Sequence, residues 1–101
     1  MINLCTYLIP LDDAHEYDEN DYEDIWDDQL TIPLIDIENN SRLHDLIKEI
    51  SADASAELWI ISKIVITDVK TGNTIGHVYF TKDWKYTIKP KVTFTTLKSI
   101  W

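Results

Sequence analysis

Residues 57–69, ELWIISKIVITDV, decide the fold of this chain. Their β-branched and aromatic side chains are typical of a β-strand. Regular alternation places Leu58, Ile60, Ile64 and Ile66 on one face of the strand, and Trp59, Ile61, Val65 and Val69 on the other. Apolar side chains on both faces predict a strand that is covered, at least in part, on both sides.

The sequence after this strand predicts two more strands. Residues 70–73, KTGN, have the composition of a turn in which Gly72 adopts a positive φ. Residues 74–80, TIGHVYF, then return antiparallel. After a second turn, residues 85–95 alternate between apolar and polar side chains, and Pro90 indicates an edge strand or a bulge. We therefore expect a C-terminal three-stranded meander.

The sequence before this strand predicts a further strand and a helix. Residues 2–9, INLCTYLI, read as a strand that Pro10 ends, and Cys5 is expected to serve as a small core side chain. Residues 31–37, TIPLIDI, suggest a short extended piece. The clearest helix follows Asn40 or Ser41, with Leu43, Leu46, Ile47 and Ile50 at the spacing of one helix face.

These elements predict an α+β protein with an antiparallel sheet of about four strands and one or two helices packed on one face. Residues 1–101 are expected to form a single domain, since this length supports one modest core. An acidic segment, residues 12–28, is inserted between the N-terminal strand and the helical region.

The acidic segment, DDAHEYDENDYEDIWDD, holds ten carboxylates in seventeen residues and no Lys or Arg. Residues 1–41 carry a formal charge of −12, and residues 42–101 carry +3, which together give the net charge of −9. This asymmetry favours a basic protein partner and argues against direct binding of nucleic acid or of an anionic membrane.

Two local structures suit the acidic segment. Tyr22, Ile25, Trp26, Gln29 and Leu30 fall on one side of a helix, which predicts a helix over residues 18–30. The alternative is an ordered loop anchored by Tyr22 and Trp26. In a helix the segment would span about 26 Å, with one charge per roughly 2.6 Å, close to the one per about 1.7 Å of duplex DNA. In an extended chain the charge density halves.

No motif in the sequence indicates catalysis or a bound metal. Residues 18–29 begin like a calcium loop, but Tyr22, Glu23 and Gln29 replace the residues that such a loop requires. Gly72 and Gly76 are the only glycines, which leaves no phosphate-binding loop. A solvated run of acids also lacks the contrasting environments that paired catalytic carboxylates need. We expect no enzyme, no cofactor and no metal site.

The C-terminal region offers one argument for binding nucleic acid. Five lysines interleave with Trp84 and Tyr86: Lys82, Lys85, Lys89, Lys91 and Lys98. The solvated face of an edge strand accounts for them equally well, since lysines there oppose aggregation.

The sequence predicts a cytoplasmic protein. Cys5 is the only cysteine, so no internal disulfide forms, and a reducing compartment is the simplest setting. The N-terminal residues lack the basic region of a secretory signal, and no apolar run reaches the roughly 20 residues of a membrane span.

Together these features predict a non-enzymatic acidic inhibitor that blocks a basic nucleic-acid-handling protein. The favoured setting is an immunity protein that neutralises a bacterial nuclease toxin. One alternative is a phage anti-defence protein, such as an anti-CRISPR or a restriction inhibitor that mimics DNA. A second is a small homo-oligomeric structural or assembly protein. The expected partner-binding residues are Asp18, Glu19, Asp21, Tyr22, Glu23, Asp24, Trp26, Asp27 and Asp28.

Overall fold

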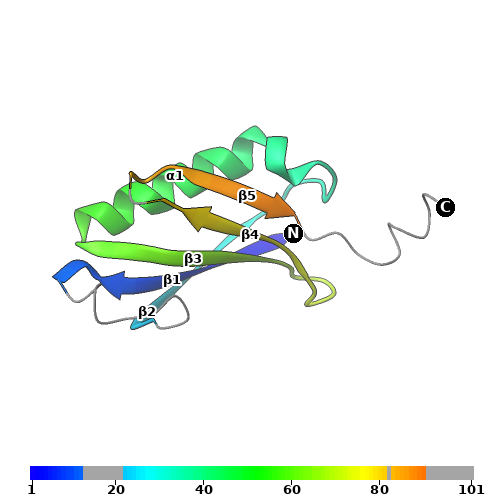
Figure 1. The fold of residues 1–101 in the computed structure, drawn as a ribbon. Coiled ribbons are helices and arrows are strands. Elements are labelled where there is room, and N and C mark those ends of the chain that lie inside the picture. Colours follow the sequence, from blue (N-terminus) through cyan, green and yellow to red (C-terminus); the bar gives the residue numbers. More distant parts are fainter. Residues whose placement is uncertain (13–21, 82, 91–101) are drawn as a thin grey trace.

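The computed structural model describes residues 1–12, 22–81 and 83–90. In chain order its elements are β1 (Ile2–Pro10), β2 (Asp24–Leu30), the short 3-10 helix η2 (Ile37–Asn39), α1 (Ser41–Ala56), β3 (Trp59–Asp68), β4 (Thr74–Phe80) and β5 (Tyr86–Pro90). All five strands are antiparallel and form one sheet in the order β2-β1-β3-β4-β5. The helix α1 lies across one face of this sheet (Figure 1).

This architecture confirms the α+β prediction, with five strands rather than about four. The N-terminal strand joins the sheet between β2 and β3, and β3, β4 and β5 form the predicted meander as far as Pro90. Gly72 has the expected positive φ, 75°, in the turn between β3 and β4. The predicted continuation of the last strand to residue 95 lies outside the described residues.

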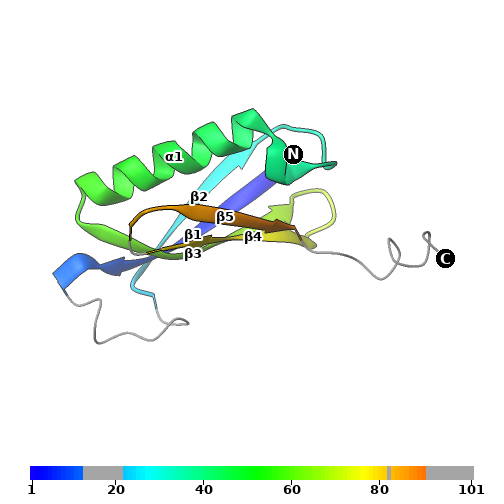
Figure 2. The same ribbon diagram turned by 45° about the horizontal axis from the view of Figure 1, so that its top comes forward.

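The core lies between α1 and the sheet, as the turned view in Figure 2 shows. Buried side chains of the helix are Leu43, Ile47, Ile50 and Ala54, which face Ile2, Leu4, Leu8, Ile64, Ile66 and Val78 of the strands. The Asn40 side chain accepts a hydrogen bond from the Leu43 amide, so it caps the helix as predicted. Leu46 is only half-buried, because it lies toward the β2 edge.

The predicted division of β3 into two faces is wrong at its start. Tyr7 pairs with Lys63, but the next residue, Leu8, pairs with Ile61. Ser62 is thus an extra residue in β3, a bulge that reverses the alternation. Ile61 is consequently buried on the same face as Ile64.

Leu58 does not belong to β3. It follows the end of α1 with a φ of 61°, and its side chain is exposed. Among the described helices, α1 and η2 both pack on the same face of the sheet, so covering of both faces of β3 is not confirmed. The other face of the sheet, which we call the open face, carries half-buried residues such as Cys5, Tyr7 and Val65.

The predicted helix over residues 18–30 is also wrong where the structure describes it. Asp24–Leu30 is the strand β2, paired with β1 from Ile2↔Leu30 to Leu8↔Asp24. A helix would bring carboxylates three and four residues apart onto one surface, whereas a strand sends Asp27 and Asp28 to opposite faces. Pairing with β1 also satisfies the backbone groups of the segment that point toward β1. Residues 31–37 do not form a strand and lead instead into η2.

Candidate functional site

The main site candidate is a groove between the edge strand β2 and the helix α1. We call it the acidic groove and define it by Trp26, Asp27 and Asp28 of β2, Glu49 and Asp53 of α1, and Glu57 directly after α1. Its two adjoining parts have volumes of about 390 and about 400 Å³. Leu46, Ile50 and Ala56 add apolar surface to the wall formed by the helix.

The register of β2 and the period of α1 bring these groups together. Trp26 lies opposite Thr6 and Asp28 lies opposite Leu4, on the face of the sheet that α1 covers. The three helix-side acids, Glu49, Asp53 and Glu57, recur every four residues, which places them in one row along the helix surface. Strand and helix therefore each supply one side of the groove.

The acidic groove is strongly negative. Burial raises the pKa of the Asp28 carboxyl above its usual value, and the neighbouring carboxylates of Glu49, Asp27 and Asp53 raise it further. Among the described residues that line the groove there is no Lys or Arg. Arg42 lies outside this lining, and its guanidinium donates to the Thr31 carbonyl just beyond the end of β2. The groove thus has carboxylates in excess of any positive charge.

The structure brings together only some of the predicted site residues. Trp26, Asp27 and Asp28 line the acidic groove. Asp24 lies at the start of β2, where its carboxylate accepts a hydrogen bond from the Ile25 amide. The amide of Glu23 donates to the Leu8 carbonyl just before the strand begins.

The remaining predicted site residues are separate from the groove or undescribed. Tyr22 packs edge-on against Tyr7, with ring centroids 5.0 Å apart. Tyr7 points to the open face, so Tyr22 is separated from the groove by the sheet. Asp18, Glu19 and Asp21 lie outside the described residues.

Trp26 serves both the core and the groove surface. Its ring is half-buried and packs against the hydrophobic core, while another part of it lines the acidic groove. The sequence posed a choice between a core contact and a partner contact for this residue. In the fold the two contacts are compatible, because Trp26 sits at the margin where the core meets the edge of the sheet.

Sequence reasoning missed the helix-side acids Glu49, Asp53 and Glu57. Their four-residue spacing is visible in the sequence and indicates a single acidic row. What the sequence did not reveal is that this row faces the acidic segment. The reason is that residues 24–30 were expected to form a helix or loop rather than a strand beside α1.

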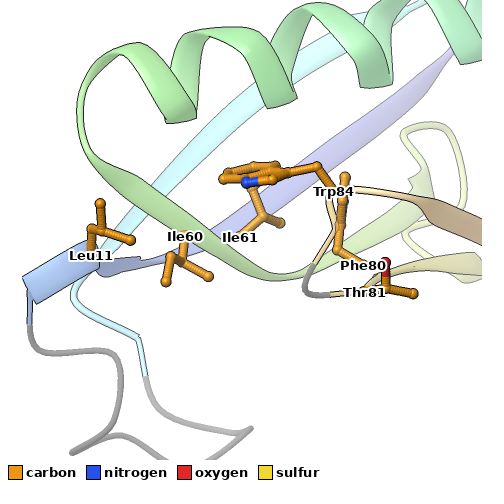
Figure 3. Close-up of a pocket in the computed structure, with 6 residues that line it drawn as sticks. All are labelled: Leu11, Ile60, Ile61, Phe80, Thr81 and Trp84. Atoms are coloured by element: carbon orange, nitrogen blue, oxygen red, sulfur yellow. The ribbon is translucent and has the colours of Figure 1, made fainter.

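A second hollow, apolar in character, opens at the end of the sheet near the β4–β5 turn. Figure 3 shows its lining from three segments: Leu11 after β1, Ile60 and Ile61 at the start of β3, and Phe80, Thr81 and Trp84 around the turn. Its volume is about 360 Å³. Trp84 adopts a φ of 61°, and the edge of Phe80 contacts its ring at a centroid separation of 6.3 Å. The described lining offers no ionisable group for chemistry.

His44 has a structural role between the helix and the far edge of the sheet. Its Nδ1 lies 2.6 Å from the Tyr86 hydroxyl, and its Nε2 lies 2.7 Å from the Glu38 carbonyl oxygen. Because a carbonyl only accepts, Nε2 carries the proton and Nδ1 accepts from Tyr86. His44 thereby joins α1 to η2 and β5. Within residues 1–12, 22–81 and 83–90, no group of three His, Cys, Asp or Glu side chains is arranged to hold a metal ion.

Cys5 lies on the open face, not in the core as expected. It is half-buried between Asp27 of β2 and Val65 of β3. Burial raises the pKa of its thiol, with a further contribution from the Asp27 carboxylate. The thiol is therefore poorly suited to act as a nucleophile.

Two further findings concern membrane-spanning helices and similar proteins. Over its described part, no helix combines the length and apolar character needed to cross a membrane. No protein-family model, curated protein or solved structure matches the sequence or the fold.

Proposed function

We propose that this protein is a non-enzymatic acidic inhibitor that binds and blocks a basic nucleic-acid-handling protein. The observation that carries the proposal is the acidic groove, in which carboxylates of β2 and α1 surround the half-buried ring of Trp26. An aromatic side chain in a hollow with a charged rim has the composition of a protein-binding hot spot. The setting that we favour is an immunity protein bound to a bacterial nuclease toxin.

The arrangement of charge supports a target that normally binds phosphate. The carboxylates of β2 are farther apart than they would be in a helix, because an extended chain rises more per residue. The acidic row on α1 compensates for the lower charge density of β2, since it carries about one acid per turn, about 6 Å apart. The row on α1, with Asp28 beside it, suits a cleft built for nucleic acid and steers such a partner toward the groove.

The proposal is tested by capture and inhibition. Immobilised protein is exposed to a lysate of the source cells, the bound proteins are identified by mass spectrometry, and the nuclease activity of each is assayed with and without inhibitor. We expect a basic nuclease to be captured and inhibited. The triple variant Asp28→Asn, Glu49→Gln, Asp53→Asn should weaken inhibition about tenfold or more, since buried charge contacts are worth more than 1.4 kcal/mol.

A matched control removes the same amount of charge away from the groove. The variant Asp12→Asn, Asp45→Asn, Asp83→Asn changes three exposed acids that do not line it. This control should inhibit almost as well as the unaltered protein. Equal inhibition by the groove variant and the control would reject the proposal. Capture of a CRISPR effector or a restriction enzyme in place of a toxin would favour the anti-defence alternative.

A second candidate function, a small homo-oligomeric assembly protein, is favoured by the open face. Tyr22, Ile25 and Tyr79 are exposed there, at 50%, 38% and 44% respectively. Light scattering at low and high salt distinguishes the two candidates. A stable oligomer that buries the acidic groove would support assembly, and a monomer at both salt concentrations would count against it.

A further inference from the structure

We propose that the outer edge of β2 is a docking site for an extended basic segment of the partner, which joins the sheet as an added strand beside the acidic groove. This inference rests on the proposed function and deepens it, since it specifies how the basic partner is held. Strand addition to a free sheet edge is an established mode of recognition: main-chain hydrogen bonds supply affinity and alternate side chains supply specificity.

β2 forms one margin of the sheet. It pairs with β1 on one side, and no described strand lies on its other side. An edge strand presents a row of backbone N–H and C=O groups that are open to pairing with another chain.

The hydrogen bonds of β1 show which backbone groups of β2 point outward. The Met1 carbonyl accepts from the Val69 amide, and the Leu11 amide donates to the Leu58 carbonyl, so odd-numbered residues of β1 point toward β3. Since backbone groups alternate along a strand, even-numbered residues of β1 point toward β2.

The register then identifies the outward groups of β2 itself. Even-numbered residues of β1 pair with even-numbered residues of β2, as in Leu4↔Asp28. The N–H and C=O groups of Ile25, Asp27 and Gln29 therefore point away from the sheet.

One of these outward amides has a local partner and two do not. The Ile25 amide donates to the Asp24 carboxylate at 2.9 Å, a contact that only an amide outside the β1–β2 ladder is free to make. The amides of Asp27 and Gln29 have no hydrogen-bond partner among the described residues. Together with the three outward carbonyls, they form a main-chain site independent of the carboxylates.

The side chains around this edge select a basic strand. Asp28, Glu49 and Asp53 line the groove next to the outward backbone groups of β2. The side chains of Trp26 and Leu46 line the same groove. Alternate side chains of an added strand would face this groove. Lysine or arginine suits it, because the charged head meets carboxylates while the aliphatic stem covers Trp26.

The two margins of the sheet differ in a way that supports this choice. The outer margin formed by β5 carries Lys89 and Pro90, which oppose strand pairing. β2 has neither lysine nor proline, and its acids repel a second copy of β2 while they attract a basic strand. The edge is thus protected against self-association and remains open to a partner of opposite charge.

The test uses a synthetic peptide of alternating lysine and valine, about eight residues long, as the basic strand. Its affinity is measured by calorimetry against Gln29→Pro and Gln29→Val. Proline removes an outward amide without removing a β1–β2 hydrogen bond, and valine retains the amide. A second form of the peptide carries N-methyl groups on every amide, which keeps all charges and blocks pairing along either edge.

We expect the peptide to bind the unaltered protein and Gln29→Val with affinities within about twofold. Gln29→Pro, and the N-methylated peptide with the unaltered protein, should bind about tenfold more weakly, the loss of roughly one to two main-chain hydrogen bonds. Absence of peptide binding, or equal binding of the two peptide forms, would overturn the inference. The comparison of the two peptide forms uses only the unaltered protein, so it remains valid even if Gln29→Pro fails to fold.

Failure of this inference is distinguishable from failure of the proposed function. If Asp28→Asn, Glu49→Gln, Asp53→Asn loses nuclease inhibition but Gln29→Pro retains it, strand addition is rejected and the acidic inhibitor stands. If the groove variant retains inhibition, the proposed function itself is rejected, whatever the peptide does.

Discussion

At the scale of single residues, Thr6 carries a polar group in an apolar setting. It is fully buried between Trp26 of β2 and Ile64 of β3, and its hydroxyl has no hydrogen-bond partner among the described residues. A buried hydroxyl without a partner costs about 1–3 kcal/mol in desolvation. Thr6 therefore lowers the stability of the core relative to an apolar side chain of the same shape.

We predict that Thr6→Val stabilises the protein by about 1 kcal/mol, because a methyl group replaces the unpaired hydroxyl in nearly the same volume. Urea unfolding measures the change. The control Thr6→Ser keeps the hydroxyl, loses a buried methyl group, and should destabilise by about 1 kcal/mol. A Thr6→Val variant less stable than the unaltered protein would mean that the hydroxyl has a hydrogen-bond partner.

Leu58 holds a backbone conformation that favours glycine. It follows the helix with a φ of 61°, its amide donates to the Ser55 carbonyl, and its carbonyl accepts from the Leu11 amide. These bonds close the end of α1 and set the direction of β3. The left-handed conformation costs a residue with a Cβ atom roughly 1 kcal/mol.

Leu58→Gly should therefore raise the free energy of unfolding by about 0.5–1 kcal/mol. Little burial is lost, since the side chain is 60% exposed. The matched change Leu58→Ala keeps the strained Cβ and should give no gain. Thermal unfolding followed by circular dichroism compares the two, and a gain with alanine equal to that with glycine would contradict the explanation.

At the scale of elements, the contact between β2 and α1 is electrostatically unfavourable. Asp28 faces Glu49 and Asp53 of the helix and neighbours Asp27 on its own strand. The pKa of Asp28 is raised, first by burial and then by these carboxylates. The folded state thus binds a proton at Asp28 more tightly than the unfolded chain does. Between the usual pKa of 3.8 and the raised value, this residue makes stability fall as pH rises.

Asp28→Asn should remove the loss of stability that the charged Asp28 causes as pH rises. We expect the variant to be more stable by about 0.5 kcal/mol at neutral pH, a modest gain because solvent screens a partly exposed group. At about pH 3 and below, where Asp28 is protonated in both states, the two proteins should converge in stability. Denaturant unfolding across this pH range provides the measurement. A variant that loses stability at pH 7 would show that Asp28 has a favourable partner.

At the scale of the whole molecule, the uneven charge makes stability depend on salt. The net charge is −9, and the first 41 residues carry acids without any base. Within the described part, four acids of β2 and α1 line one groove, namely Asp27, Asp28, Glu49 and Asp53. Self-repulsion of this kind destabilises the compact state and is screened over about 10 Å at 0.1 M salt.

We predict that raising sodium chloride from about 0.02 M to about 0.5 M increases the free energy of unfolding by about 1 kcal/mol, the sum of several like-charge contacts of a few tenths each. The variant Asp28→Asn, Glu49→Gln, Asp53→Asn should show a smaller increase. Urea titrations at the two salt concentrations compare the proteins. Equal salt dependence in both would place the repulsion elsewhere than the groove.

The fold class was predictable because its determinants are local. Side-chain periodicity in residues 57–69 and 2–9, the i, i+3, i+4, i+7 pattern after Asn40, and Gly72 in its turn each indicate one element without knowledge of the others. The strand at residues 24–30 was not predictable in this way. Its helical spacing of apolar residues was outweighed by backbone pairing with β1, which lies far from it in sequence.

The sequence by itself determined the class of the fold, the excess of acid in the first 41 residues and the prediction of a basic partner. Only the tertiary structure decided where those acidic side chains lie. In the tertiary structure Trp26 faces α1, whereas Tyr22, which precedes β2, packs against Tyr7 on the open face. The register of β2 on β1 turned Asp28 toward α1, and the packing of α1 brought Glu49 and Asp53 to the same groove. Charge is a property of composition, whereas a groove requires two elements whose contact depends on long-range pairing.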